Sequence, residues 1–350
     1  MNFLGIATVL ALAGSAYAAQ LASALDLNTR GNEASDAGKY EDAIRLYRES
    51  LAIWSASGPE YDAHRAGTLF NLGIAISAAG NRPEAVRVME QALALHRKTL
   101  GVRNHRTIAN INLLASNYLM IGELERAEAL LNEALPIERE LYPADIQLAR
   151  TLEGICNAFV RRGKADDAIA PAEEALAIAT KISGEDSLDT ALAYSNVAEA
   201  HRSTGHPERS LPLFRKARAI YTSKLGPDHP RVASLLSQEG LIMLHDGKLA
   251  TAEQLMQDSI GALTRGCPKC VVELAIAEHN LAVLRIQQKR YREADDLLSH
   301  VVTLREGFTS SPGPELAATL QLLAAVREKE KLFADARRLN QRASMILGFR

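Results

Sequence analysis

The chain repeats a pattern of small residues at an interval of about 42 residues. Glycine, and at the end lysine, recurs at one place of the repeat: Gly38, Gly80, Gly122, Gly163, Gly205, Gly247, Lys289 and Lys331. Seven residues before each of these lies a small side chain: Gly31, Gly73, Ala115, Cys156, Ala198, Gly240, Ala282 and Ala324. A fixed period of this size indicates a repeat array whose stacked units share one continuous core.

Each repeat reads as two amphipathic helices joined by a turn. In the second repeat, Leu69, Leu72 and Ile76 recur at helical spacing, and no repeat alternates apolar and polar residues as a strand would. Gly80 suits the left-handed conformation that ends a helix, and Pro83 is tolerated in the first turn of the next one. The small positions mark where two helix backbones approach closely, because a larger side chain there would overpack the core.

These residues resemble the long, about 42-residue variant of the tetratricopeptide repeat found in kinesin light chains. The linker residues 225–233, Leu-Gly-Pro-Asp-His-Pro-Arg-Val-Ala, carry the same resemblance. The resemblance covers about residues 22–347 and implies an all-α fold: a right-handed superhelical solenoid of eight helix-turn-helix repeats with the first helices on its concave side. The last helix, expected over 334–347, has Arg337, Arg338, Gln341 and Arg342 for the solvated face of a terminal cap.

The N-terminus differs from the rest, since no charged side chain precedes Asp26. An apolar stretch over 3–13 and the motif Ala16-Tyr17-Ala18 predict a secretory signal peptide over 1–18, followed by the repeat array over 19–350. The absence of Lys and Arg at its start leaves an uncleaved anchor or an ordinary buried helix as alternatives. We therefore expect an exported protein, periplasmic or extracellular and bacterial, with no membrane insertion after signal cleavage.

Polar residues of the first helices predict a binding groove. Asparagine amides both donate and accept hydrogen bonds, so a row of them can pair with the backbone of an extended peptide. One variant of the family clamps a C-terminal carboxylate with Lys or Arg, and Ala109, Asn112 and Leu113 at the corresponding face argue against that variant here. The predicted peptide-binding groove consists of Asn28, Asn32, Phe70, Asn71, Asn112, Ser116, Glu153, Asn157, Asn196, Glu199, Arg202, His279 and Asn280.

Cys267-Pro268-Lys269-Cys270 is a CxxC motif in a predicted linker. A zinc site needs four ligands, haem attachment needs a histidine where Val271 stands, and a thioredoxin site needs strands. A short disulfide between Cys267 and Cys270 is the favoured interpretation, with free thiols or a redox function as alternatives.

Composition and motifs argue against catalysis and against nucleic acid as a partner. The net charge is −2 and no run of Lys or Arg stands out. No metalloprotease, nucleophile-elbow or phosphate-loop motif is present, so we expect no enzyme, no cofactor and no metal. The predicted function is a non-enzymatic scaffold that binds a protein or peptide in its groove. The alternative is an assembly factor that docks through the end or outer face of the array in an envelope complex. Oligomeric state is left open.

Overall fold

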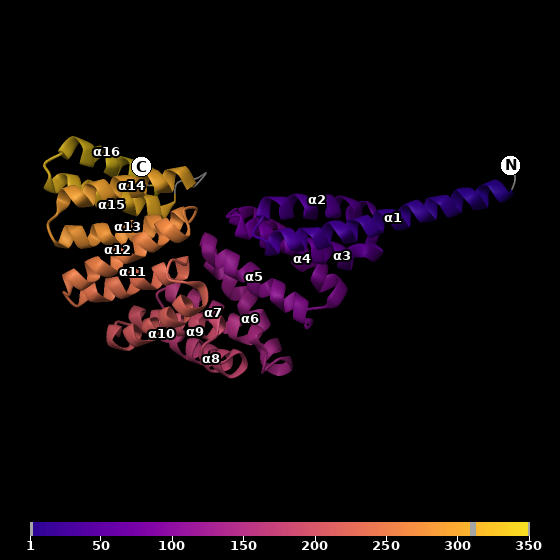
Figure 1. Cartoon of the computed structure of the whole chain (residues 1–350), viewed down its shortest axis with the longest axis horizontal. Helices are drawn as coiled ribbons and strands as arrows, with labels where there is room; N and C mark the ends of the chain where they lie inside the picture. Colours follow the sequence, from indigo (N-terminus) through magenta and orange to yellow (C-terminus); the bar gives the residue numbers. More distant parts are fainter. Residues whose placement is uncertain (1–2, 309–312, 349–350) are drawn as a thin grey trace. The chain divides into compact units, whose positions relative to one another are not determined.

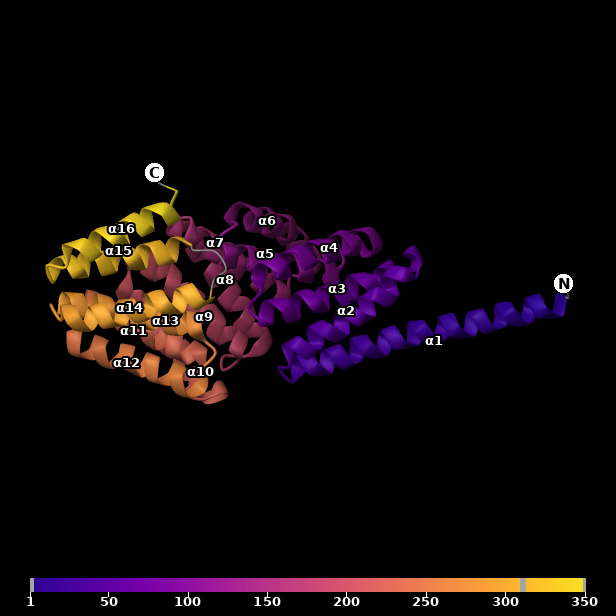
Figure 2. The same ribbon diagram turned by 90° about the horizontal axis from the view of Figure 1, so that it is seen from above.

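The computed structural model describes residues 3–308 and 313–348, and their side chains from Tyr17 onward except that of residue 308. These residues form sixteen α-helices and one short 3-10 helix, and no strand occurs among them (Figures 1 and 2). The all-α prediction is therefore confirmed. Residues 1–2 of the expected signal peptide lie outside the described part, and the side chains of residues 3–16 are likewise not described.

The chain divides into two compact units, Met1–Ile178 and Ala179–Arg350, each described by itself. Unit 1 consists of helical hairpins in chain order, in which each helix from α1 to α6 packs against the next. Its elements are α1 (Phe3–Asp36), α2 (Tyr40–Ala56), η1 (Pro59–Tyr61), α3 (Asp62–Ala78), α4 (Arg82–Leu100), α5 (His105–Ile121), α6 (Leu124–Leu141), α7 (Ile146–Arg161) and most of α8 (Ala165–Ser183).

Unit 2 continues the same alternation of helices. Its elements are the end of α8, then α9 (Leu188–Ser203), α10 (Pro207–Leu225), α11 (Pro230–His245), α12 (Leu249–Gly266), α13 (Val271–Gln287), α14 (Tyr291–Phe308), α15 (Pro314–Lys329) and α16 (Phe333–Ile346). In both units the odd-numbered helices are the first helices of the hairpins. We call the side of a unit that they form its first-helix face.

The repeated glycine lies at the turn inside each hairpin. Gly80 has a φ of 95° and separates α3 from α4, and its backbone N–H bonds to the carbonyl of Ser77 at 3.0 Å. The next helix begins at a capped end, where the Asn81 side chain accepts from the backbone N–H of Glu84 and donates to the Glu84 carboxylate. Lys289 and Lys331 adopt the same left-handed conformation in the turns of the last two hairpins, with φ values of 61° and 65°.

The small positions are the points where helices touch most closely. A Cβ atom added to Gly31 would lie 2.6 Å from Cε1 of Tyr47, so the aromatic ring of α2 fills the space that the glycine leaves. Ala85 and Ala127, which follow the turn glycines by five residues, are completely buried. Close approach of the helices thus depends on side chains too small to separate them.

Helix α16 ends the array with an exposed polar face. Arg337, Arg338, Gln341 and Arg342 are all exposed, as expected for a terminal cap. Apolar side chains are exposed on the same helix: Phe333 at 57% and Met345 at 72%.

Candidate functional site

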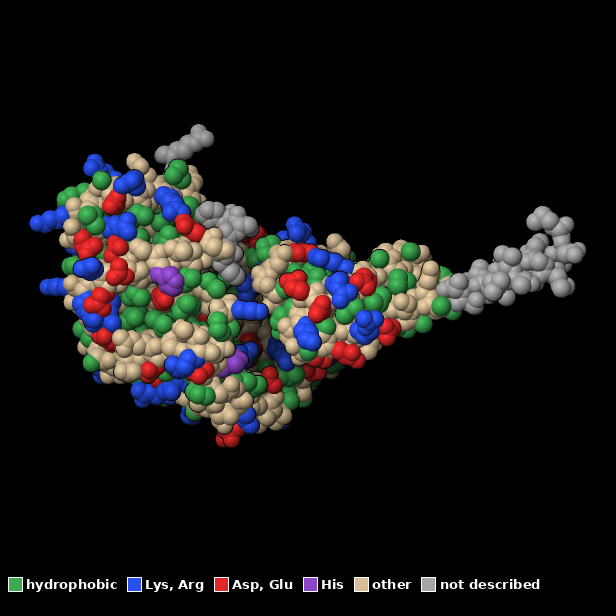
Figure 3. Space-filling view, turned by 45° about the horizontal axis from the view of Figure 1, so that its top comes forward, with side chains coloured by type: hydrophobic (Ala, Val, Ile, Leu, Met, Phe, Trp, Pro, Cys, Tyr) green, Lys and Arg blue, Asp and Glu red, His purple; other side chains and the backbone are tan. Residues whose placement is uncertain are grey.

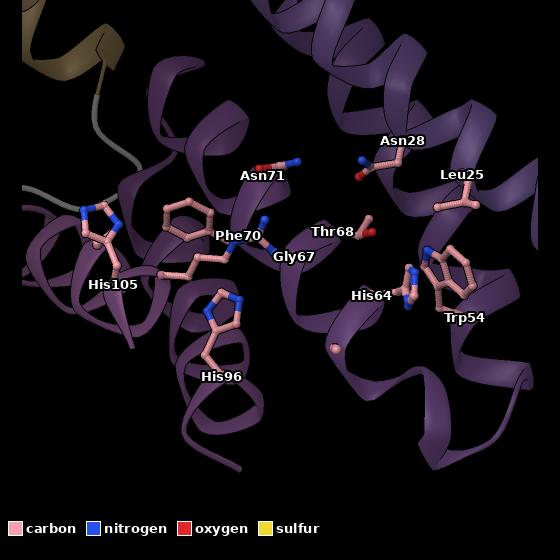
Figure 4. A pocket seen from close by; sticks show the side chains of 13 residues that line it. Leu25, Asn28, Trp54, His64, Gly67, Thr68, Phe70, Asn71, His96 and His105 are labelled. Atoms are coloured by element: carbon pink, nitrogen blue, oxygen red, sulfur yellow. The ribbon is translucent and has the colours of Figure 1, made fainter. Parts of the chain in front are cut away.

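A cavity of about 500 Å³ opens on the first-helix face of unit 1 (Figure 4). It lies among the first helices α1, α3 and α5 and is closed at its base by the last turns of α2 and α4. The lining residues are Leu25, Asn28, Trp54, Ala63, His64, Gly67, Thr68, Phe70, Asn71, His96, His105, Arg106 and Ala109. We call this cavity the unit 1 pocket.

Aromatic side chains form two walls of the unit 1 pocket. Trp54, at the end of α2, is 1% exposed, and its indole lies 4.8 Å from the imidazole of His64 and 5.7 Å from the ring of Tyr61, measured between ring centroids. Phe70 meets His96 edge to face with centroids 6.0 Å apart. Rings in these arrangements present flat apolar surface to a ligand and lose little freedom on binding.

The unit 1 pocket has positive character. None of its lining residues is Asp or Glu, and Arg106 carries its one permanent charge. The backbone N–H of Arg106 bonds to the Asn104 cap of α5 at 2.9 Å, which fixes the start of the helix. Its guanidinium makes no ion pair or side-chain hydrogen bond with any residue that the structure describes. Burial, followed by the Arg106 charge, lowers the pKa of His96, because both disfavour the protonated imidazole.

Two buried polar atoms of the pocket wall have no hydrogen-bond partner among the described residues: Oδ1 of Asn28 and Nε1 of Trp54. One is an acceptor and the other a donor. A buried polar atom without a partner is costly, so a ligand or water that pairs with them gains binding free energy.

The asparagines predicted for the first repeats divide between ligand-facing and structural positions. Asn28 and Asn71 line the pocket from α1 and α3, and Figure 4 shows them on the same side of it. Asn32 is engaged within the fold, since its Oδ1 accepts from the Tyr47 hydroxyl at 2.8 Å and from Asn71 Nδ2 at 3.1 Å. This contact ties α1 to α2 and α3.

Asn112 belongs to a buried network instead of a free surface. Its Oδ1 accepts from the Thr151 hydroxyl at 2.8 Å and its Nδ2 donates to Glu138 at 3.3 Å. Glu138 is completely buried, and this burial raises the pKa of its carboxyl, although the hydrogen bonds from Thr151 and Asn112 oppose the rise. Of the other groove residues on α5 and α7, Ser116 is exposed, Asn157 is half-buried and Glu153 is buried at 7% exposure. None of these four lines the unit 1 pocket.

The residues predicted in unit 2 do not form one site. Asn196 is 8% exposed, and Glu199 and Arg202 pair with each other along α9 at 2.8 Å. On α13, burial lowers the pKa of His279, and the Arg305 charge adds to this effect. Asn280 Nδ2 donates to the Ser237 hydroxyl on α11 at 2.9 Å. Asn280 also lines a smaller cavity between α11 and α13.

Cys267 and Cys270 lie in the linker between α12 and α13. Their sulfur atoms are 2.02 Å apart, at bonding distance, while Cys156 is a buried free thiol. Among the residues described, no group of three His, Cys, Asp or Glu side chains is placed to hold a metal ion.

Sequence reasoning missed the main determinants of the unit 1 pocket. It compared Ala109, Asn112 and Leu113 with the cationic positions of the carboxylate-binding variant, whereas the free cation stands one turn earlier, at Arg106. Trp54 is 1% exposed and also lines the pocket, and the predicted groove did not include it. Aligning the repeats at their 42-residue interval would have placed His64 and Arg106 at equivalent sites.

The comparisons with known proteins agree with this fold. Residues 64–140 and 147–223 match the family model of the tetratricopeptide repeat. Protein KINESIN LIGHT CHAIN-RELATED 1 of Arabidopsis thaliana is 22% identical over 244 residues, which cover 67% of this chain and 39% of that protein. This chain therefore matches well under two thirds of that relative's length.

Two solved structures share the architecture. The apo form of RapI gives a TM-score of 0.66 at 17% identity and covers 81% of this chain and 97% of that one. BtubC (BKLC) from P. vanneervenii gives 0.51 at 20% identity, covering 66% and 92%. The chain is thus a helical repeat protein of the solenoid class. It carries tetratricopeptide repeats over residues 64–140 and 147–223 and has kinesin light chain-like relatives, which confirms the resemblance seen in the sequence.

The class is one of generally non-enzymatic scaffolds, and its fold is typical of protein–protein interaction. On the face of the molecule drawn in Figure 3, Lys and Arg side chains intermingle with Asp and Glu, and no extended field of one sign is visible. In the part of the chain that the structure describes, no helix combines the length and the hydropathy of a membrane-spanning segment.

Proposed function

We propose that this protein is a non-enzymatic scaffold that binds a peptide segment of a partner protein in the unit 1 pocket. The observation that carries the proposal is the unpaired guanidinium of Arg106 in a pocket that has aromatic walls and no carboxylate. A charge-assisted hydrogen bond from Arg is about twice as strong as a neutral one. The ligand chemistry that fits is an acidic group next to an apolar side chain that packs on Phe70.

The single tryptophan of the chain is Trp54, so its fluorescence reports on this pocket alone. The probe pair is acetyl-Leu-Asp-Leu-amide and its neutral analogue acetyl-Leu-Asn-Leu-amide, titrated against the full chain. The acidic peptide is expected to change the Trp54 emission saturably and to bind roughly tenfold more tightly than the neutral one.

Arg106→Gln should abolish the preference for the acidic peptide. The matched control is Arg87→Gln, because Arg87 is also an exposed arginine of unit 1 but does not line the pocket. The proposal is overturned if the Arg106→Gln protein still prefers the acidic peptide. It is also overturned if neither peptide changes the Trp54 emission of the parent protein.

We further propose export to the periplasm or extracellular space, with cleavage after Ala18 and a disulfide between Cys267 and Cys270 in the mature protein. The uncharged N-terminal stretch and the Ala16-Tyr17-Ala18 motif support export. Such cleavage removes Tyr17, whose ring packs edge to face on Tyr61 at 6.3 Å, next to Trp54. N-terminal sequencing of the exported product should begin at Ala19, and a product that begins at Met1 would contradict cleavage.

One observation favours the alternative, an assembly factor that docks through the end of the array. Phe333 and Met345 are exposed apolar side chains on the last helix, α16. An end-docking factor should lose its partner in Phe333→Ser/Met345→Ser, whereas a groove binder should lose it when Arg106 is changed.

A further inference from the structure

A second cavity lies on the first-helix face of unit 2, at the same place of the repeat as the unit 1 pocket. It is lined by Ser234, Ser237, Gln238, Ser259, Leu263, Glu273, Ile276, Ala277 and Asn280, and we call it the unit 2 pocket. Glu273 follows Arg106 by 167 residues, the interval that also separates Gly80 from Gly247. By this interval Ser237 replaces Phe70, Gln238 replaces Asn71 and Leu263 replaces His96.

The two pockets have opposite charge. Where Arg106 stands in the unit 1 pocket, the unit 2 pocket has Glu273, and none of its lining residues is Lys, Arg or His. The Glu273 carboxylate is exposed and has no ion pair or side-chain hydrogen bond with any described residue. The corresponding residue of the preceding hairpin, Arg231, is engaged with the Tyr221 hydroxyl at 3.0 Å.

The base of the unit 2 pocket offers a further acceptor. Oε1 of Gln238 is buried and has no hydrogen-bond partner among the described residues. Two serine hydroxyls of the pocket already take part in hydrogen bonds within the fold: Ser259 donates to the Ala233 carbonyl at 2.6 Å, and Ser237 accepts from Asn280. An acceptor at the base and a carboxylate at the rim require a ligand that donates several hydrogen bonds and carries positive charge.

The volume of the unit 2 pocket limits the kind of ligand that it can hold. The cavity holds about 60 Å³, several times the roughly 10–15 Å³ that a cavity needs to hold one water molecule. A compact ammonium group suits so small a cavity better than a planar guanidinium or an aromatic ring. Ile276, which is 48% exposed, provides apolar surface at the rim for the remaining methylenes of the side chain.

We propose that the unit 2 pocket binds the ammonium group of a lysine side chain on a partner protein, with Glu273 and Gln238 as its acceptors. The proposal extends the groove function proposed above to a second site of opposite charge preference. Trp54 emission reports on the unit 1 pocket and the Ile276 NMR signal reports on the unit 2 pocket. The failure of one proposal can therefore be distinguished from the failure of the other.

The test is a titration of the full chain, labelled at the Cδ1 methyl groups of isoleucine, followed by NMR. The Ile276 signal is assigned by its loss in Ile276→Val. The probes are n-butylammonium, which mimics the lysine side chain, and n-butanol, which has a similar size and no charge. Butylammonium is expected to shift the Ile276 signal saturably, and butanol is expected to leave it unchanged.

Glu273→Gln should weaken butylammonium binding by roughly fivefold or more, the effect of losing one charge-assisted hydrogen bond. Gln238→Leu should weaken it as well, while Glu315→Gln should not, because Glu315 holds the same repeat position but does not line the pocket. Acetyl-lysine-amide should bind and glycinamide should not, which separates a lysine side chain from a chain terminus. The proposal is overturned by equal shifts with butanol, by unchanged affinity in Glu273→Gln, or by binding of glycinamide alone.

Discussion

A Cβ atom on Gly73 would lie 2.6 Å from Cγ of Met89, closer than real side-chain contacts allow. The same pair recurs in unit 2, where a Cβ on Gly240 would lie 2.9 Å from Cγ of Met256. In the third repeat, alanine at the glycine position faces leucine at the methionine position, as Ala115 and Leu131. In the two glycine repeats the methionine therefore fills the space that the missing Cβ leaves.

Gly73→Ala should destabilise unit 1 by about 1–2 kcal/mol, because the overpacking outweighs the better helix propensity of alanine. Adding Met89→Leu, which recreates the Ala115 and Leu131 pair, should recover part of the loss. The measurement is guanidinium unfolding followed by Trp54 fluorescence. Gly67→Ala is the control and should not destabilise, since a Cβ there meets nothing within 4 Å.

Lys289 holds a left-handed turn that glycine holds in the other repeats. Its φ is 61°, and its N–H bonds to the Ile286 carbonyl at 2.9 Å, as the N–H of Gly247 bonds to Leu244 at 3.1 Å. Lys289→Gly should raise the free energy of unfolding by roughly 0.5–1 kcal/mol, because a side chain in this region is strained. Gly247→Lys should lower it by a similar amount. A Lys289→Gly protein no more stable in thermal unfolding than the parent would contradict the strain.

Glu253 gives unit 2 an acid-sensitive contact. Its carboxylate pairs with the buried guanidinium of Arg285 at 2.8 Å and accepts from Gln288 at 2.8 Å, and these bonds, led by Arg285, lower its pKa to about 2. The pKa of Glu253 in the folded protein lies below its unfolded value of about 4.3. The contact therefore stabilises the folded protein at pH values above about 4.3, and this stabilisation is lost as the pH falls toward 2.

Glu253→Gln should therefore cost about 1–2 kcal/mol at pH 7, and the difference from the parent should vanish near pH 2. Unfolding by urea at several pH values provides the measurement. Glu49→Gln is the control, since Glu49 forms an exposed pair with Arg45 and should cost at most about 0.5 kcal/mol. If Glu253→Gln lowered the free energy of unfolding by the same amount at every pH from 7 to 2, the contribution of Glu253 would not be ionic.

Cys267→Ser/Cys270→Ser should lower the stability of unit 2 by at most ~2 kcal/mol, because closing so short a loop removes little entropy from the unfolded chain. A reducing agent should have the same effect on the parent and none on the double variant. Thermal unfolding in both conditions measures this difference, and mass spectrometry of the oxidised protein checks the bond. If the reducing agent left the thermal unfolding of the parent protein unchanged, the disulfide would not stabilise the fold.

The fold was predictable from local signals that repeat. The turn glycines, the prolines in first turns and the small helix positions each act within one hairpin, so their spacing alone defined the helices. The glutamate and arginine at 199 and 202 pair at a separation of three along α9, which the sequence alone could have indicated.

The site was harder to predict because its members meet only through tertiary packing. Asn112 looked like a groove residue, yet it bonds to Glu138 and Thr151 on the next two helices. Trp54 and Arg106 come from helices three apart in the chain and converge on one cavity. Periodicity places residues on a face, but it does not say which of them the neighbouring helix uses.

One position in the first turn of each first helix, represented by Arg106 and Glu273, varies from hairpin to hairpin, whereas the small positions between the helices recur. Along the chain this position reads His64, Arg106, Gln147, Asp189, Arg231, Glu273 and Glu315. If both pockets bind as proposed, recognition depends on this position in two hairpins, whereas in another hairpin Arg231 at the same position contacts Tyr221 within the fold. A substitution at Arg106 or Glu273 would then change the choice of partner without altering the small residues that let the helices pack.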